Sequence, residues 1–168
     1  MAEFTDAIAL LKADHRKVED LFEQFEKASG SASKRELAHQ ICVELKIHTA
    51  IEEEIFYPAF RGKIEDDTLD EAYVEHDGAK VLVNDIEAGS PGDDFYDAKV
   101  KVLSEQIEHH VEEEEKRMEG MFSQARNAGL DMDSLGDQLR ARKEELLAHY
   151  KANGLTKPET TTLTEATV

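Results

Sequence analysis

The sequence has few of the residues that interrupt helices or cross-link a chain. It contains one cysteine, no tryptophan, three prolines and nine glycines in 168 residues. A single cysteine excludes an intramolecular disulfide and any cysteine-based metal cluster. Sparse glycine and proline, together with abundant Ala, Glu, Lys and Leu, are typical of a protein built from long helices.

Long apolar runs and excess positive charge are also missing. No apolar segment approaches the ~20 residues that span a bilayer, and the N-terminus lacks the basic region of a signal peptide, so we expect a cytoplasmic protein. Lys and Arg number 20 against 38 Asp and Glu, which gives a net charge of −18. Such a surface repels nucleic acid and anionic membranes. Neither is expected as a partner, and the chain is expected to be a monomer or a weak homodimer.

Turn-forming segments divide the chain into helical stretches. The breaks are SGSAS at 29–33, RGKIEDD at 61–67, GSPGDD at 89–94 and NAG at 127–129. They predict helices at about 4–28, 34–60, 68–88 and 94–127, and a shorter one at 133–151. Short connections favour antiparallel neighbours. We therefore predict an all-α protein: an up-down four-helix bundle over 1–128, an additional helix packed on it over 129–152, and a flexible Thr-rich tail over 153–168.

Each predicted bundle helix carries one histidine on its apolar stripe. Residues that recur every three or four positions share a helix face, and these stripes contain His15, His48, His76 and His110. Two stripes also carry a glutamate one turn later. Glu52 follows His48, and Glu114 follows His110.

An ionised glutamate in an apolar core is costly unless it is paired or bound to a metal. The alternative is a purely structural role, in which each histidine is a hydrogen-bonded core residue. This role requires a separate hydrogen-bond partner for every imidazole. Spacing of i, i+4 places imidazole and carboxylate on one face. This donor set suits iron, manganese or zinc, and iron is the usual choice where open positions serve oxygen chemistry.

Three segments carry a resemblance to a known family: Asp14-His15, HTAIEEEIFYP at 48–58, and HHVEEEE at 109–115. Over residues from about 5 to 122 the chain resembles the hemerythrin-like, HHE cation-binding family. The resemblance implies a four-helix bundle around two iron ions joined by an oxo or hydroxo group. It also implies that His15 and His48 bind one iron, that His76 and His110 bind the other, and that Glu52 and Glu114 bridge them.

The sequence departs from the oxygen-carrying members of that family at one ligand position. Lys80 stands where those proteins have a second histidine. Water, Glu53 or Tyr73 are the candidates to complete the second iron. His109 with Glu113 is an alternative to His110 with Glu114.

An incompletely ligated iron favours reaction with peroxide, nitric oxide or dioxygen, as in a catalase-like or peroxidase-like detoxifying protein. The alternative is a non-catalytic protein that binds, senses or stores dioxygen, nitric oxide or iron. A ferritin-like site needs E-x-x-H on two helices, and this spacing occurs once, at Glu36–His39, off the stripe. Glu54 and Glu115 are expected at the surface, and Met118 and Met121 in the core.

Overall fold

The computed structural model describes residues 6–164, and all regular structure within that range is helical. The elements are α1 (Ala7–Lys27), α2 (Ser31–Ile51), the π-helix η1 (Glu52–Phe56), α3 (Tyr57–Phe60), α4 (Asp66–Ala88), α5 (Tyr96–Glu115), α6 (Met121–Asn127) and α7 (Met132–Asn153). The all-α prediction is confirmed.

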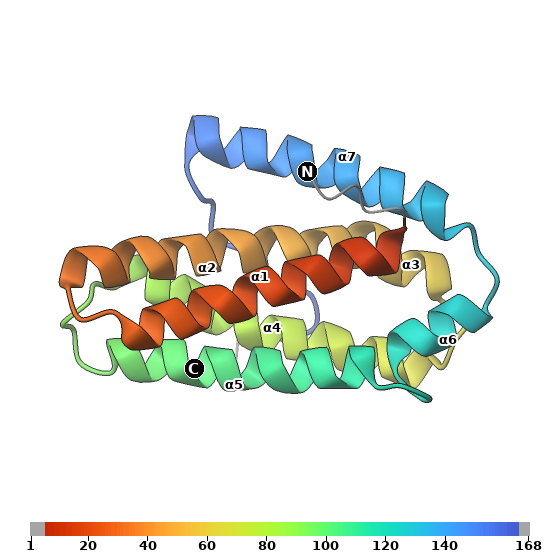
Figure 1. Ribbon diagram of the computed structural model, residues 1–168, viewed down its shortest axis with the longest axis horizontal. Coiled ribbons are helices and arrows are strands. Elements are labelled where there is room, and N and C mark those ends of the chain that lie inside the picture. Colours follow the sequence, from red (N-terminus) through yellow and green to blue (C-terminus); the bar gives the residue numbers. More distant parts are fainter. Residues whose placement is uncertain (1–5, 165–168) are drawn as a thin grey trace.

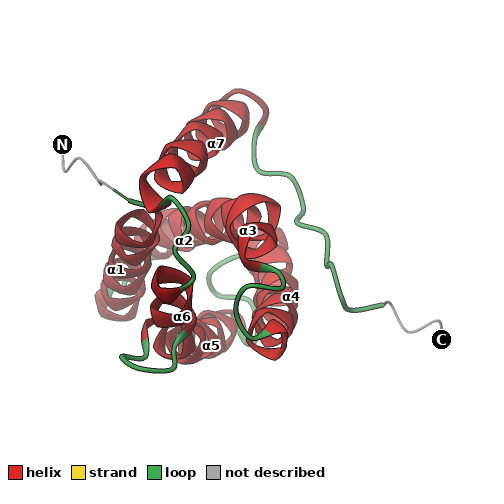
Figure 2. Ribbon diagram, turned by 90° about the vertical axis from the view of Figure 1, so that its right-hand side faces the viewer, coloured by secondary structure: helices red, strands yellow, loops and turns green. Residues whose placement is uncertain are grey.

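Four long helices form the bundle. Helices α1, α2, α4 and α5 lie side by side, and consecutive ones run in opposite directions (Figure 1). Contacts join α1 to α2, α2 to α4, α4 to α5 and α5 back to α1, so the four enclose a common centre. Helix α7 packs outside this ring on α1 and α2, while α6 covers one end of the bundle (Figure 2).

The bundle interior consists of two apolar clusters on either side of a polar layer. Along α1, residues 7–11 belong to one cluster and 18–25 to the other. Buried Asp14 and His15 lie between them. The same change occurs along α4, where His76 separates Leu69 of the first cluster from Ala79 of the second. Water is therefore excluded from both sides of the polar layer.

The second bundle helix begins three residues earlier than the predicted 34–60 and changes its winding before it ends. Backbone hydrogen bonds widen to i→i+5 over η1, and the helix then continues as α3 to Phe60. Pro58 explains the change, because its ring lacks an N–H and would clash with the carbonyl of Glu54 in a regular α-helix. The wider turn accommodates the proline without ending the helix.

The predicted continuous helix over 94–127 is wrong, because the chain turns sharply after Glu115 and starts α6 at Met121. Gly120 closes the turn, where a Cβ atom would lie 2.4 Å from the carbonyl oxygen of Lys116. Met118 lies in the turn and is 85% exposed, contrary to its expected core position, whereas Met121 is buried. His110 and Glu114 consequently occupy the end of α5 rather than the middle of a long helix.

The segment after α7 has no helix or strand, yet it makes specific contacts with α4. The Asp77 carboxylate accepts backbone N–H groups from Thr161, Thr162 and Leu163. Figure 2 shows this loop passing alongside α4. Composition predicts a flexible tail here, but it does not reveal that buried Asp77 needs these donors. The last predicted tail residues, 165–168, and the first, 1–5, lie outside the described range.

None of the helices within residues 6–164 combines the length and the apolar character needed to cross a membrane.

Gly136→Ala should weaken the packing of α7 on the bundle. A Cβ at Gly136 would lie 2.9 Å from the backbone at Asp6 and Ala7, which is too close for any real contact. We expect a loss of roughly 1–3 kcal/mol in the free energy of unfolding, measured by urea denaturation. Gly78→Ala is the matched control, because its Cβ would meet nothing nearer than 3.7 Å. Equal stability of the two variants would contradict this packing.

Candidate metal centre

The six residues that the sequence analysis selects converge in the polar layer. Their side chains come from four elements: α1, α2 with η1, α4 and α5. None is more than 5% exposed; the six are His15, His48, Glu52, His76, His110 and Glu114. The structure therefore brings the whole predicted ligand set together.

The histidines form two pairs whose Nε2 atoms face one another. The Nε2 atoms of His15 and His48 are 3.1 Å apart, and those of His76 and His110 are also 3.1 Å apart. These are the two pairs that the family resemblance assigns to separate metal ions.

The two glutamates lie between the pairs. Glu52 has one oxygen 3.2 Å from Nε2 of His48 and the other 3.1 Å from Nε2 of His76. Glu114 likewise reaches Nε2 of His110 at 3.3 Å and Nε2 of His15 at 3.2 Å. Each carboxylate thus spans from one pair to the other, as a carboxylate that bridges two metal ions must do.

Each histidine also meets a carboxylate at Nδ1, on the side of the ring that faces away from the centre. The contacts are His15–Glu115 at 2.7 Å, His48–Asp14 at 3.3 Å, His76–Glu53 at 3.0 Å and His110–Glu75 at 3.1 Å. An Nδ1–H donated to a carboxylate leaves Nε2 free to bind a metal and fixes the orientation of the ring. The sequence analysis assigns none of the four this role: it names Glu53 as a candidate metal ligand and places Glu115 at the surface.

Charge in the metal-free cluster is set by the close packing of acids and imidazoles. Burial opposes a charge on His48, but the negative charge of Glu52 prevails and raises the pKa of His48 to about 10. Burial and repulsion from Glu114 oppose ionisation of Glu52, but His48 and His76 hold its pKa at about 2. Burial also opposes charge on His110, whose pKa is nevertheless raised well above its usual value by Glu114. A metal ion binding here would displace the protons from these imidazoles.

The buried oxygens of the cluster provide a test of whether a cation fits. Glu52 Oε1 and Glu114 Oε2 are buried and have no hydrogen-bond partner among the described residues. An unsatisfied buried carboxylate oxygen is costly. Both atoms lie near imidazole Nε2 atoms, in two groups of donors whose ligand atoms all lie within 4.8 Å of one another. The residues present therefore fit a bound metal.

Tyr57 joins the centre, although the sequence analysis did not select it. Its hydroxyl lies 2.8 Å from Glu114, 3.1 Å from Glu52 and 3.1 Å from Nε2 of His76. In a regular α-helix, residues five apart face different sides, but η1 brings Tyr57 onto the face of Glu52. The proline that follows, Pro58, was the available signal for this local change of winding.

The residues proposed to replace the missing ligand lie elsewhere. Glu53 binds the outer nitrogen of His76 and the ammonium of Lys80, so it is not among the inward donors. Tyr73 reaches the backbone oxygen of Glu53 at 3.4 Å rather than the centre. His109 is exposed and outside the cluster. Tyr57, whose hydroxyl lies 3.1 Å from Nε2 of His76, is instead the additional side chain that approaches the second histidine pair.

A family model, hemerythrin HHE cation-binding domain, matches residues 6–122. The chain belongs to this family. The matched range contains every inward donor and ends within α6, so α7 and the segment after it lie beyond the HHE domain.

Two individual proteins are also similar to this HHE chain. The crystal structure of an HHE domain-containing protein from Mycobacterium kansasii superposes with a TM-score of 0.75 at 22% identity, covering 89% of this chain and 94% of that one. A Nostoc sp. protein named DNA nickase is 30% identical over 118 residues, which are 70% of this chain and 33% of the nickase. The chain thus corresponds to about a third of that relative's length.

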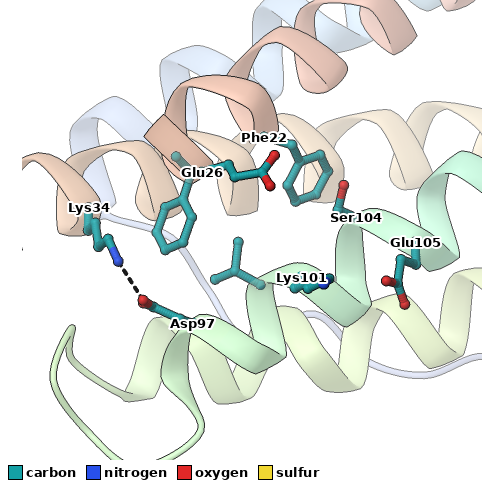
Figure 3. Close-up of a pocket in the computed structure, with 9 residues that line it drawn as sticks. Phe22, Glu26, Lys34, Asp97, Lys101, Ser104 and Glu105 are labelled. Atoms are coloured by element: carbon teal, nitrogen blue, oxygen red, sulfur yellow. Dashed lines mark hydrogen bonds and ion pairs between the residues drawn. The ribbon is translucent and has the colours of Figure 1, made fainter. Parts of the chain in front are cut away.

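A separate surface pocket lies between α1 and α5, away from the HHE donors. It has a volume of about 300 Å³ and an apolar floor that includes Phe22 and Phe25. Figure 3 shows the ion pair of Lys34 with Asp97 at one side of it. Its lining contains no histidine, so it does not share the chemistry of the metal centre.

Glu114→Gln should remove most of the bound metal, because it weakens a carboxylate that contacts both histidine pairs. Glu113→Gln is the matched control: it is the exposed neighbour on the same turn and the acid of the alternative ligand pair. The measurement is metal content of the two purified variants by elemental analysis. Metal lost from the Glu113 variant and kept in the Glu114 variant would contradict the assignment.

Proposed function

We propose that this HHE protein binds two iron ions and uses them to react with a small ligand: peroxide, nitric oxide or dioxygen. One ion would be held by His15 and His48 and the other by His76 and His110, with Glu52 and Glu114 as bridges. The observation that carries this proposal is the position of the two glutamates. Each of them contacts one histidine of the first pair and one histidine of the second pair. Imidazole and carboxylate donors with open positions suit non-haem iron.

With both glutamates as bridges, each ion would have two imidazoles and two carboxylate oxygens as protein donors. Bound iron supplies Lewis acidity and one-electron redox chemistry. Lys80 ion-pairs with Glu53 and Asp77 instead of adding a donor, so coordination positions remain for an outside ligand.

The surroundings of the donors favour a very small ligand. A cavity of about 10 Å³ adjoins the four histidines and is otherwise lined mainly by apolar side chains, including Val18, Leu45 and Ile107. This volume is about that of one water-sized probe. It has room for a ligand about the size of one water molecule and none for an organic substrate.

Tyr57 contributes a hydroxyl group at this centre. Burial, together with the charges of Glu114 and Glu52, raises the pKa of the Tyr57 hydroxyl well above its ordinary value. The side chain is thus held as a phenol, with its oxygen 3.1 Å from Nε2 of His76. We assign it the role of a hydrogen-bond donor to a ligand at the second ion.

DNA, the substrate indicated by the name of the nickase relative, does not fit this chain. The net charge of −18 repels phosphate backbones. Two thirds of the nickase also lie outside the matched segment. We therefore propose the small ligand as the partner and not a nucleic acid.

Elemental analysis and an optical spectrum of the aerobically purified protein, followed by peroxide and nitric oxide assays, test the function. We expect about two irons per chain and turnover of at least one of these ligands. Two irons that bind nitric oxide or dioxygen reversibly, without turnover, would support the non-catalytic alternative. A protein that takes up no iron under anaerobic loading would refute both.

Tyr57→Phe should keep the iron and slow the reaction, because it removes only the hydroxyl. A preorganised hydrogen-bond donor contributes roughly 10²-fold or more to a rate, so a loss of that order is expected in peroxide turnover. Tyr73→Phe is the matched control, since its hydroxyl contacts only the backbone of Glu53. Unchanged turnover in the Tyr57 variant would show that its hydroxyl has no role in the reaction.

A further inference from the structure

Three of the four outer carboxylates are themselves held by a cation. Arg16 binds Glu115 at 2.9 Å. Lys143 of α7 binds Asp14, and Lys80 of α4 binds Glu53. Glu53 and Lys80 are in turn both contacted by Thr161, which follows α7. Residues 131–164, which comprise α7 and the segment after it, thus approach the metal centre from two sides.

The first approach comes from α7. The ammonium group of Lys143 binds Oδ1 of Asp14, whose other oxygen lies 3.3 Å from Nδ1 of His48. Asp14 is only 6% exposed, so water cannot replace a lost partner freely. Lys143 therefore helps to hold the carboxylate that orients His48.

The second approach comes from the segment after α7. The Thr161 hydroxyl lies 2.9 Å from Oε2 of Glu53 and 3.2 Å from Nζ of Lys80. Glu53 in turn contacts Nδ1 of His76 at 3.0 Å. Backbone N–H groups at Thr161 and its two successors bind Asp77, the neighbour of His76 on α4.

We propose that residues 131–164 act as a clamp that retains the metal, with Lys143 and Thr161 as its positioning residues. Lys143 would hold the ligand side chain His48 through Asp14, and Thr161 would hold His76 through Glu53. The clamp thereby acts on one histidine of each pair through an outer carboxylate. The proposal rests on metal binding at the proposed centre but not on the reaction carried out there.

Contacts other than that of Lys143 also hold α7 on the bundle. The effect of Lys143 on the position of His48 can therefore be tested without detaching the helix. Arg142 binds Glu54 at 2.7 Å, and buried Leu135 and Leu139 pack into the bundle core. Removing the charge of Lys143 therefore leaves the helix in place. A purely structural role would change stability without changing metal release.

The first test is Lys143→Gln in the full-length, iron-loaded protein. Release of iron to an excess of a ferrous chelator is followed under anaerobic conditions. We expect release about tenfold faster than in the wild type, because outer partners of metal ligands typically change metal affinity by this order. Lys151→Gln, an exposed lysine of the same helix, is the matched control and should release iron at the wild-type rate.

The second test uses Thr161→Val, which removes the hydroxyl and keeps the shape of the side chain. Loss of its hydrogen bonds should speed iron release by roughly two- to tenfold. The exposed Thr164 provides the control variant, Thr164→Val.

Coupling between sites is reciprocal, so bound metal should also stabilise the clamp. Hydrogen exchange measured by mass spectrometry should be slower over residues 155–164 in the iron-loaded protein than in the metal-free one. Thr161→Val should reduce this difference, whereas Thr164→Val should preserve it.

The outcomes separate this inference from the proposed function. The clamp would be overturned if both test variants released iron at the wild-type rate and hydrogen exchange over residues 155–164 were the same in the iron-loaded and metal-free protein. This would hold even if the protein consumed peroxide. Faster release in both variants from a protein that binds iron but consumes no ligand would support the clamp and refute the catalytic proposal. A wild type that binds no metal would overturn both.

Discussion

Two ionised glutamates in a buried layer are the constraint on which the rest of this structure depends. Glu52 and Glu114 are almost completely buried, and each has one oxygen without a hydrogen-bond partner among the described residues. Burial of such groups is tolerated only with compensating positive charge. Four imidazoles surround them, and four further carboxylates hold those imidazoles with their Nε2 atoms inward. The bundle helices hold these side chains between two apolar clusters, which shield them from solvent.

Local departures from ideal helix geometry also serve the same layer. The π-helical turn η1 keeps Glu52 in place while it turns Tyr57 toward the centre. The break after Glu115 lets the chain fold back, so that Phe122 of α6 stacks on the ring of His15 at 5.8 Å between ring centres. Irregular backbone is thus concentrated where the site is built, which is common at functional sites.

The inward residues were predictable because helix periodicity and the cost of a buried charge are local rules. His48 and Glu52 lie four residues apart on an apolar stripe, and this pattern identifies them as inward-facing residues. The same is true of His110 and Glu114. The outer carboxylates were not predictable in the same way. Whether Glu115 or Glu113 reaches a histidine of another helix depends on how the helices are rotated against one another. The contact of Asp77 with the segment after α7 likewise joins residues more than 80 positions apart, and no local pattern encodes it.

We propose that this layer holds two iron ions bridged by two glutamates, and anomalous X-ray diffraction from crystals of the iron-loaded protein would locate them. We expect two iron peaks, one between the Nε2 atoms of His15 and His48 and one between those of His76 and His110. We also expect Glu52 and Glu114 each to contact both ions. A single peak, or iron bound only outside this layer, would contradict this proposal.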